Sequence, residues 1–315
     1  MKELKTTDYP LVSIVTVNYN NADMTRGLLQ SLRNITYQAT EVIVVDNASS
    51  DNAYKDLIIE FPDTKFLRSN TNLGYAGGIN LGFGHAQGDL LLSINNDVEV
   101  SPFFLEPMVS MFLNNPEAGM ASPKILFDSE PQRIQYAGST GINPWTGRGK
   151  KVGYMNLDCD KYDYIAETSL VHGACMMVSR QLIETIGLIP EEYFLYYEEH
   201  DWAESTKRAG FKLYYVGSSV ITHKASGSVG ANSPLKTYYM NRSRLMFIRR
   251  NSTGLKLITS TIFYVLLAIP KNCLFFLINR DTSNFKAFIK ALIWHFDNGS
   301  VWNRKIRTYY SAVAK

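Results

Sequence analysis

The sequence has only three cysteines, Cys159, Cys175 and Cys273, and they lie far apart. An odd, sparse set without metal spacing excludes a disulfide framework and a zinc site, so we expect a reducing compartment. The polar segment 1–10 lacks the apolar run of a signal peptide, and we therefore expect no export.

Motifs of several enzyme classes are also missing. There is no Walker A sequence and no Gly-x-Ser-x-Gly elbow. Gly82, Gly84 and Gly88 do not fit the dinucleotide fingerprint, because they follow a predicted helix instead of a strand. These absences argue against a P-loop enzyme, a hydrolase and a dehydrogenase.

Acidic residues are lacking between Glu204 and Asp281, although the net charge of the whole chain is only +3. Twelve basic residues fall in that stretch: Lys207, Arg208, Lys212, Lys224, Lys236, Arg242, Arg244, Arg249, Arg250, Lys256, Lys271 and Arg280. A long stretch with charge of one sign indicates an anionic partner, which can be a phosphate-bearing substrate, a membrane surface or a nucleic acid. Composition alone does not choose among the three.

Uncharged apolar runs long enough to cross a membrane are absent too. Residues 255–278 are strongly apolar, but Pro270, Lys271 and Asn272 interrupt them. No run therefore reaches the about 18 residues of a spanning helix. We expect two helices that lie along a membrane surface, with the basic flank toward anionic lipid. A buried helical pair is the alternative.

The composition is otherwise that of a globular protein with a substantial core, with 45% hydrophobic and 19% charged residues among 315. Residues 11–125 alternate strand and helix patterns, which predicts parallel βαβ units. The predicted strands are 11–18, 41–46, 64–68 and 90–94, and the predicted helices are 23–33, 51–61, 73–86 and 101–114.

The second half of the chain is less regular. Glycine and proline recur between 129 and 163, which predicts a loop region or an irregular hairpin. Regular patterns return at 169–178, 199–209, 212–216 and 220–223, and small polar residues at 226–234 predict a linker. We place one domain at 1–234, with parts 11–126 and 127–234, and a basic, amphipathic helical region at 235–315.

Two predicted strands end on a carboxylate. Strand 41–46 ends at Asp46, and strand 90–94 is followed by Asn95, Asn96 and Asp97. In an open α/β sheet, ligands bind outside the carboxyl ends of the strands. These acids are therefore candidates for binding a nucleotide base or a metal-bound phosphate; the alternative is that they are solvated acids in turns.

Asp97 is the candidate metal ligand. A strand-end carboxylate beside amide groups suits Mg²⁺ or Mn²⁺, with phosphate oxygens completing the shell. His223 ends a predicted strand before the linker and is a candidate second ligand. A lone histidine is, however, more often structural.

Three acids, Glu198, Glu199 and Asp201, cluster at the start of a predicted helix beside Tyr197 and Trp202. Partial burial against aromatic rings would raise a carboxylate pKa and make one of them a general base. The alternative is that they only complement the helix dipole.

Taken together, these residues resemble family 2 glycosyltransferases with the GT-A fold, close to the bacterial rhamnosyltransferase-like branch. The resemblance covers roughly residues 11–250. Four segments match the family's opening strand, base-binding segment, Gly-rich helix and metal motif: 12–20 (VSIVTVNYN), 44–51 (VVDNASSD), 72–80 (NLGYAGGIN) and 95–97 (NND). The resemblance implies an α/β fold, namely a GT-A type αβα sandwich with a mostly parallel central sheet. It also implies a C-terminal helical segment close to the membrane.

The resemblance also implies a donor site for a nucleotide-diphosphate sugar. Asp46 would accept a hydrogen bond from a pyrimidine N3–H, with Thr16 and Asn18 in the same pocket. Asp97 would bind Mg²⁺ or Mn²⁺, and His223 resembles the family's later metal-binding histidine. The remaining donor-side positions are Asn47, Gly74, Asn80, Asn95 and Asn96.

On the acceptor side, the family usually has Glu-Asp where this chain has Glu198-Glu199. The second acid is the catalytic base, so Glu199 is the implied base and Asp201 the alternative. The segment 173–176 resembles the one that flanks donor sugar and acceptor. The other positions expected near the acceptor are Gly173, Ala174, Trp202, Arg242 and Arg244.

The expected function is that of an inverting, metal-dependent hexosyltransferase. The first expected donor is dTDP-L-rhamnose, with UDP-linked hexoses or N-acetylhexosamines as alternatives. The expected acceptor is a hydroxyl of a cell-surface glycan or a polyprenyl-diphosphate-linked oligosaccharide. We expect a cytoplasmic protein, peripheral on the anionic inner face of the inner membrane, without nucleic acid; a homodimer is compatible with the sequence.

Two other classes compete with this interpretation. A sugar-phosphate nucleotidyltransferase shares the αβα sandwich but needs a Gly-rich, basic loop after the first strand, where this chain has residues 19–22 (YNNA). A membrane-recruited protein that binds nucleotide sugars without catalysis stays open, because Glu stands at the base position. A nucleic-acid binder would explain the basic stretch but not the acidic strand ends.

Overall fold

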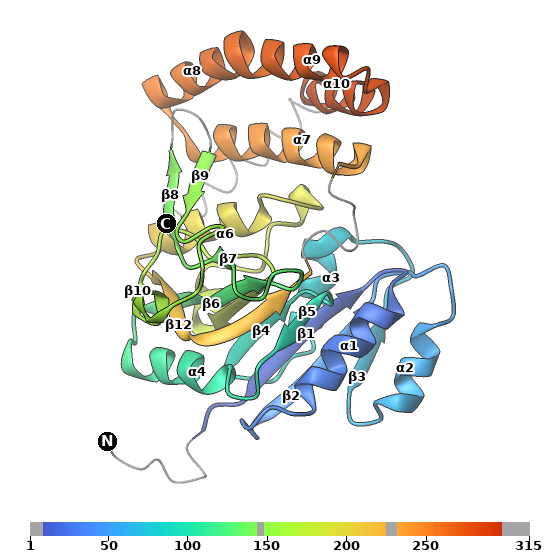
Figure 1. Cartoon of the computed structure of the whole chain (residues 1–315), viewed down its shortest axis with the longest axis vertical. Helices are drawn as coiled ribbons and strands as arrows, with labels where there is room; N and C mark the ends of the chain where they lie inside the picture. Colours follow the sequence, from blue (N-terminus) through green and yellow to red (C-terminus); the bar gives the residue numbers. More distant parts are fainter. Residues whose placement is uncertain (1–8, 144–147, 225–231, 298–315) are drawn as a thin grey trace.

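The computed structural model describes residues 9–143, 148–224 and 232–297; residues 226–231 of the predicted linker lie outside this part. Four parallel strands form one half of its central sheet, in the order β4 (Leu90–Ile94), β1 (Val12–Asn18), β2 (Thr40–Asp46) and β3 (Lys65–Arg68). Figure 1 shows them with the helices that connect them. The predicted parallel βαβ units are confirmed.

Helices cover both faces of this half, which explains the continuous apolar strands. Ile14 of β1 packs in one cluster with Leu28 of α1 (Ala22–Leu32), whereas its neighbour Val15 packs with Ile79 of α3 (Gly74–Phe83). Alternate residues of β1 therefore serve opposite layers. Leu57 of α2 (Tyr54–Glu60) joins the α1 side.

The other half of the sheet is mixed. β11 (Cys175–Ser179) runs antiparallel between β4 and β6 (Ala118–Phe127), and β12 (Lys212–His223) runs parallel to β6. The predicted strands 212–216 and 220–223 are one strand whose register shifts between Val216 and Val220. The remaining strands are β5 (Val98–Val100), β7 (Ile134–Tyr136) and β10 (Ile165–Glu167) at this side, with the separate hairpin β8 (Ser139–Asn143) and β9 (Arg148–Lys151).

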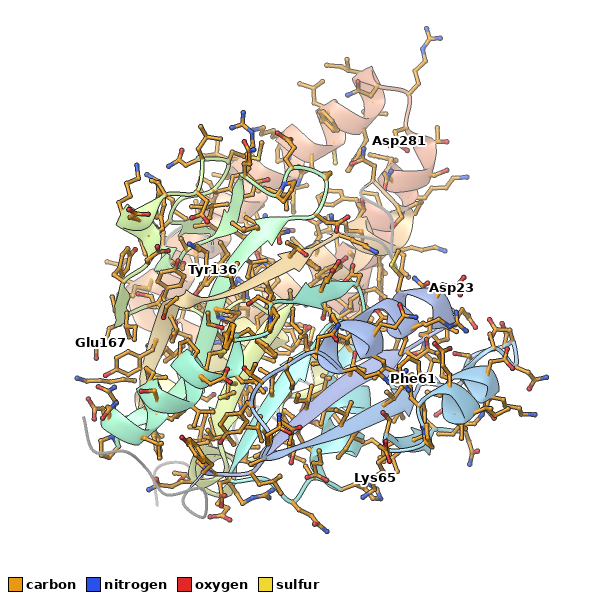
Figure 2. All side chains as sticks on the ribbon, turned by 60° about the horizontal axis from the view of Figure 1, so that its bottom comes forward. Asp23, Phe61, Lys65, Tyr136, Glu167 and Asp281 are labelled. Carbon is orange, nitrogen blue, oxygen red and sulfur yellow. The ribbon has the colours of Figure 1, made fainter. Side chains whose placement is uncertain are left out.

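Seven further helices complete the described chain. They are α4 (Leu105–Asn114), α5 (Arg180–Ile186), α6 (Glu198–Arg208), α7 (Pro234–Asn251), α8 (Gly254–Phe263), α9 (Ile269–Ile278) and α10 (Thr282–Asp297). The last four form a layer beyond one end of the sheet (Figure 1). In Figure 2, Asp281 marks this layer, Asp23 and Phe61 mark the β1–β3 half, and Glu167 marks the opposite half.

The predicted break at Pro270 is wrong. A π-helical turn, Tyr264–Ala268, joins α8 to α9, so residues Gly254–Ile278 form one helix of 25 residues. Proline lacks an N–H and normally disrupts a helix, but here it falls in the first turn of α9, directly after the π turn. By length and composition this helix is able to cross a membrane, which is weak support for a span.

α7 is packed against the α/β part through α6. The carboxylate of Asp201 on α6 is fully buried and lies 3.0 Å from Nε of Arg250 on α7. Asn251 Nδ2 donates to the same carboxylate at 2.6 Å. Met246 and Phe247 of α7 are also buried in a shared cluster. The predicted boundary at 234/235 thus falls at the first residue of a helix that packs on the α/β part.

Replacing Arg250 with methionine will destabilise the protein strongly, because the Asp201 carboxylate stays buried without its cation. We expect the free energy of unfolding in urea to fall by about 3–5 kcal/mol. The control is Lys207→Met, which removes a partly exposed ion pair with Glu204 and should cost at most about 1 kcal/mol. Equal losses in the two variants would contradict a structural role for the buried pair.

Candidate active site

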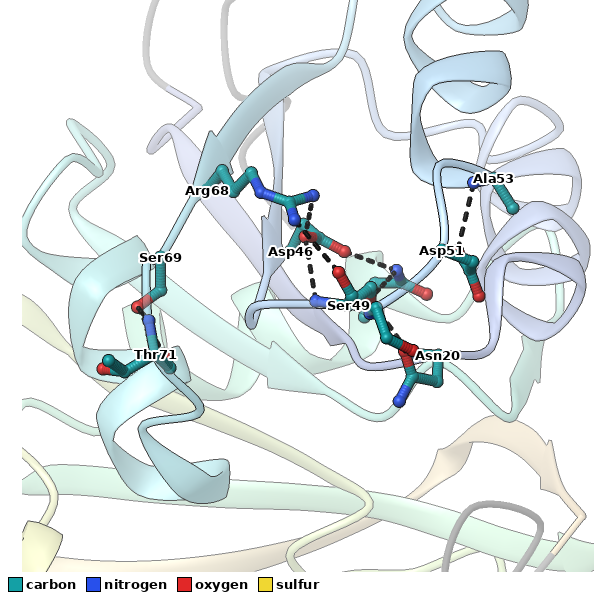
Figure 3. Close-up of polar contacts among 10 residues, drawn as sticks. Asn20, Asp46, Ser49, Asp51, Ala53, Arg68, Ser69 and Thr71 are labelled. Carbon is teal, nitrogen blue, oxygen red and sulfur yellow. Dashed lines mark hydrogen bonds and ion pairs between the residues drawn. The ribbon is translucent and has the colours of Figure 1, made fainter.

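Asp46 is buried at the carboxyl end of β2, directly beside Asn18 at the end of β1. Asn18 Nδ2 donates to Asp46 Oδ1 at 2.9 Å, and the Ser49 amide donates to Oδ2 at 3.3 Å. Figure 3 shows Asp46 and Ser49 of this group. The network holds the carboxylate in one orientation, as recognition of a nucleotide base requires.

Arg68 is a partner of Asp46 that the sequence did not reveal. It ends β3, in register with Asp46, and its Nη1 lies 2.8 Å from Asp46 Oδ2 (Figure 3). Its second Nη group donates to the Ser49 carbonyl at 3.0 Å, and the guanidinium lies over the Tyr54 ring. The sequence does place Arg68 at the end of a predicted strand. That this strand lies beside the one that ends at Asp46 is known only from the strand order.

The Gly-rich segment is joined to the same edge by Asn47. Its Nδ2 donates to the Gly74 carbonyl at 2.9 Å, and its Oδ1 accepts from the Leu73 amide at 2.9 Å. Asn80, also predicted on the donor side, instead binds the main chain of Ile189 through both ends of its amide. The structure thus gives Asn80 contacts to the segment before α6.

Asp97 and His223 come together, as their predicted role as a pair requires. Oδ1 of Asp97 lies 3.2 Å from Nε2 of His223, and both residues are buried. Nδ1 of His223 lies 2.8 Å from Oε1 of Gln135. Because an amide oxygen only accepts, the Nδ1–H is the donor, and Nε2 is the ring atom that faces Asp97.

This pair fits a divalent ion. Two ligands on one Mg²⁺-sized ion, each about 2.1 Å from it and at right angles, lie about 3 Å apart. A metal-binding histidine normally donates its other N–H to an acceptor, as His223 does to Gln135. No group of three or more His, Cys, Asp or Glu in the described part of the chain forms a metal cage, so further ligands would have to come from a substrate or water.

The other predicted amides frame this pair. Asn95 Nδ2 lies 3.5 Å from His223 Nε2, and Asn96 Nδ2 donates to the hydroxyl of Thr25 at 3.1 Å. The main-chain N–H of Asn95 donates to the carbonyl of Ala174 at 2.9 Å. Thr16 is fully buried on β1, and its hydroxyl has no hydrogen-bond partner among the described residues.

Glu199 lies against Gly173 of the segment 172–174. A Cβ built on Gly173 would lie 3.5 Å from the Glu199 carboxyl carbon. The His172 ring is 6.1 Å from the His223 ring, centre to centre. The segment 172–174 therefore touches both the base candidate and the metal-ligand candidates.

The pKa values of the two acids at the start of α6 are shifted in opposite directions. Burial raises the pKa of Glu198 well above its usual value, and the negative charge of Glu199 adds to that rise. Burial also acts to raise the pKa of Glu199, but His200, 3.2 Å away, a main-chain hydrogen bond and the charge of Lys151 together lower it. Glu199 is therefore the more readily ionised of the two, as a general base must be.

The loop before α6 is held in an unusual backbone conformation. Phe194, Tyr196 and Tyr197 have φ angles of 61°, 66° and 72°, a region that costs non-glycine residues about 1–3 kcal/mol each. The main-chain N–H of Tyr75 donates to the Phe194 carbonyl at 2.8 Å. The hydroxyl of Tyr75 donates to the Gly173 carbonyl at 2.8 Å. Tyr75, which we did not predict, thus fixes both segments that flank Glu199.

Three predicted acceptor-side residues are used in packing. Asp201 faces Arg250 on α7, and the indole of Trp202 donates to the Gly187 carbonyl at 3.2 Å. Arg242 donates to the Glu192 carbonyl at 3.1 Å and also to that of Tyr193.

Arg244 lies at the edge of this region. Its Nε donates to the hydroxyl of Tyr197 at 3.0 Å, and Tyr197 directly precedes Glu198.

Comparison with known proteins gives the class. Residues 13–187 match the family model for glycosyl transferase family 2. N-acetylglucosaminyl-diphospho-decaprenol L-rhamnosyltransferase of Mycobacterium tuberculosis is 22% identical over 78% of this chain and 86% of its own length. The low-salt glycan biosynthesis hexosyltransferase Agl10 of Haloferax volcanii is 25% identical over 64% and 63%.

Solved structures agree on the fold. GalNAc-T7 with UDP, GalNAc and Mn²⁺ superposes with a TM-score of 0.63 at 16% identity, covering 77% of this chain and 48% of that one. The mannosyltransferase PcManGT of Pyrobaculum calidifontis, with GDP-Man and Mn²⁺, gives 0.56 at 17% identity, covering 98% and 87%. The protein is a glycosyltransferase with a GT-A fold, as predicted. It belongs to glycosyl transferase family 2.

Gly74→Ala will disturb the loop before α6. Gly74 has φ +73°, and a Cβ there would lie 2.4 Å from the Phe194 carbonyl oxygen. Gly254, the first residue of α8 as Gly74 is of α3, has φ +55° with nothing within 4 Å of its Cβ position, so Gly254→Ala is a matched control for backbone strain alone. We expect Gly254→Ala to cost about 1–2 kcal/mol in urea unfolding and Gly74→Ala about 1–3 kcal/mol more. Equal costs would show that the loop does not resist the added methyl group.

Proposed function

We propose that this glycosyltransferase is inverting and metal-dependent, and that it moves a sugar from a nucleotide diphosphate to a hydroxyl of a lipid-linked or cell-surface glycan. The observation that carries the proposal is the segment 172–174, because His172 lies beside His223 of the Asp97–His223 pair and Gly173 lies against Glu199. A donor diphosphate and an acceptor hydroxyl would meet at this segment.

The strand ends of β1 and β2 supply the proposed nucleotide site. Asp46, oriented by Asn18 and Arg68, would accept the N3–H of a pyrimidine. dTDP-L-rhamnose is the first proposed donor, since a relative at 22% identity is named as a rhamnosyltransferase. A UDP-linked sugar is the alternative, because GalNAc-T7 was solved with UDP.

Asp97 and His223 would hold Mg²⁺ or Mn²⁺. Such an ion neutralises charge that develops on a diphosphate leaving group. In both ion-bound neighbours named above the ion is Mn²⁺. Gln135 would keep the His223 ring in the tautomer that a ligand needs.

Glu199 would act as the general base. It takes the proton of the acceptor hydroxyl as that oxygen attacks the anomeric carbon. The bond from that carbon to the diphosphate oxygen breaks with its electron pair, and the nucleoside diphosphate leaves. The pKa of Glu198 is raised and Asp201 is paired with Arg250, so neither is available as a second nucleophile beside Glu199, which suits a single displacement with inversion.

We place the protein along a membrane surface, on the cytoplasmic face. Ten large apolar side chains of residues 254–278 are exposed: Leu255, Ile258, Ile262, Val265, Leu266, Leu267, Leu274, Phe275, Leu277 and Ile278. The other side of this helix is occupied, because Tyr264 is buried and its hydroxyl donates to Asn241 of α7 at 3.3 Å. A helix that exposes most of its apolar side chains while α7 holds Tyr264 fits contact with a membrane surface.

Donor binding tests the nucleotide and metal sites. We expect dTDP or UDP to raise the melting temperature more than GDP or ADP, and only with Mn²⁺ present. Asp97→Ala should abolish the effect because it removes a ligand. Glu199→Gln should keep it but lower transfer by about 10²–10⁴-fold, since the base is lost. Metal-independent stabilisation, or full transfer by Glu199→Gln, would overturn the proposal; binding without transfer by the wild type would favour the non-catalytic alternative.

Vesicle flotation tests the membrane surface. Leu266→Glu combined with Leu274→Glu should abolish flotation on phosphatidylglycerol vesicles, because two charges enter the apolar side. Ile59→Glu combined with Leu157→Glu is the matched control, since these side chains are 81% and 59% exposed outside the C-terminal helices. Equal flotation of both double variants would contradict this placement.

A further inference from the structure

A cavity lies between α7, α9 and α10, away from the strand ends. Its volume is about 410 Å³, within the range of about 300–1,000 Å³ that is typical of ligand pockets. Five asparagines, two cations and one acid are among its described lining residues, together with Phe275 and Phe276. We call it the α7–α9 cavity.

The two cations, Lys236 and Arg244, both come from α7. The acid, Asp281, precedes α10 and is bound to its first turn. Its Oδ1 accepts a hydrogen bond from the amide N–H of Asn284 at 3.1 Å, and its Oδ2 accepts one from Asn284 Nδ2 at 2.7 Å. These bonds satisfy the first turn of α10. Three of the five asparagines already donate their side-chain N–H groups to protein oxygens, so the two cations are the groups that suit phosphate oxygens.

The α7–α9 cavity is also linked to the reaction centre. Arg244 lines it and binds the Tyr197 hydroxyl, and the next residue, Glu198, begins α6. A ligand in the cavity would lie next to the proposed acceptor position.

On its other side the cavity opens toward the proposed membrane surface. Phe275 lines the cavity and is also 59% exposed, and its neighbours Leu274 and Ile278 are exposed on the same helix. A single ligand with a charged group and a long apolar chain would fit both the cationic cavity and the exposed apolar side chains of α9.

We infer that the α7–α9 cavity binds the diphosphate of a polyisoprenoid-linked acceptor. This inference rests on the proposed function, because it assigns the acceptor of the same reaction. Lys236 and Arg244 bind the phosphates, and the isoprenoid chain leaves past Phe275 along the apolar side of α9. The sugar attached to the diphosphate then points past Tyr197 toward Glu199.

Calorimetric titration with farnesyl diphosphate tests the assignment on the full chain. EDTA is present, so that metal-dependent binding at the donor site does not contribute. Lys236→Gln combined with Arg244→Gln should weaken binding at least about tenfold, because two charge-assisted contacts are lost. Lys256→Gln combined with Lys271→Gln, which changes exposed cations outside the cavity, should change it less than about twofold.

Control ligands distinguish binding of the diphosphate from binding of the apolar chain or of a lipid headgroup, and a single variant controls for misfolding. Farnesol should not bind, and dihexanoyl-phosphatidylglycerol should bind much more weakly than farnesyl diphosphate. Equal binding of these probes, or equal weakening in both double variants, overturns the inference. Lys236→Glu alone repeats the test where the Arg244 change unfolds the protein. Nucleotide stabilisation with Mn²⁺ should persist in the cavity variants; its absence in the wild type would overturn the proposed function instead.

Discussion

The loop that leads into α6 is the constraint on which the candidate site rests. Three of its residues, Phe194, Tyr196 and Tyr197, have positive φ angles, so the loop needs contacts that over-determine it. They come from both sides: Tyr75 binds the Phe194 carbonyl, and Arg242 binds the Tyr193 carbonyl. The position of Glu199 is therefore set by α3 and α7 together.

The same loop explains why α7 cannot be separated from the reaction centre in physical terms. Burying Asp201 is unfavourable unless Arg250 and Asn251 are in place, and both belong to α7. Arg244 of α7 adds a second link to the segment before α6, through the hydroxyl of Tyr197. The proposed membrane surface and the proposed base are therefore joined through packed side chains of α6 and α7.

Sequence patterns predicted the features that depend on local chemistry. Apolar runs that end at Asp46 and before Asp97 predicted strand ends, and parallel strands necessarily bring such ends to one edge. Features that depend on strand order or packing were not predictable. The ten-residue strand β6 was not singled out, because alanine, glycine and proline interrupt its apolar pattern. Arg68 reaches Asp46 only because β3 lies beside β2.

Charge and proline content say less about two further segments than packing does. The basic stretch 205–280 indicated an anionic partner, yet two of its cations, Arg242 and Arg250, are buried and bind main-chain or carboxylate oxygens. Likewise, Pro270 suggested a break, although a π turn placed just before it lets the helix continue. A sequence shows which groups are charged or lack a donor, whereas tertiary contacts decide which of them meet solvent. The cations of this stretch that can reach a ligand are thus fewer than composition implies, and Lys236 and Arg244 are the two that line the α7–α9 cavity.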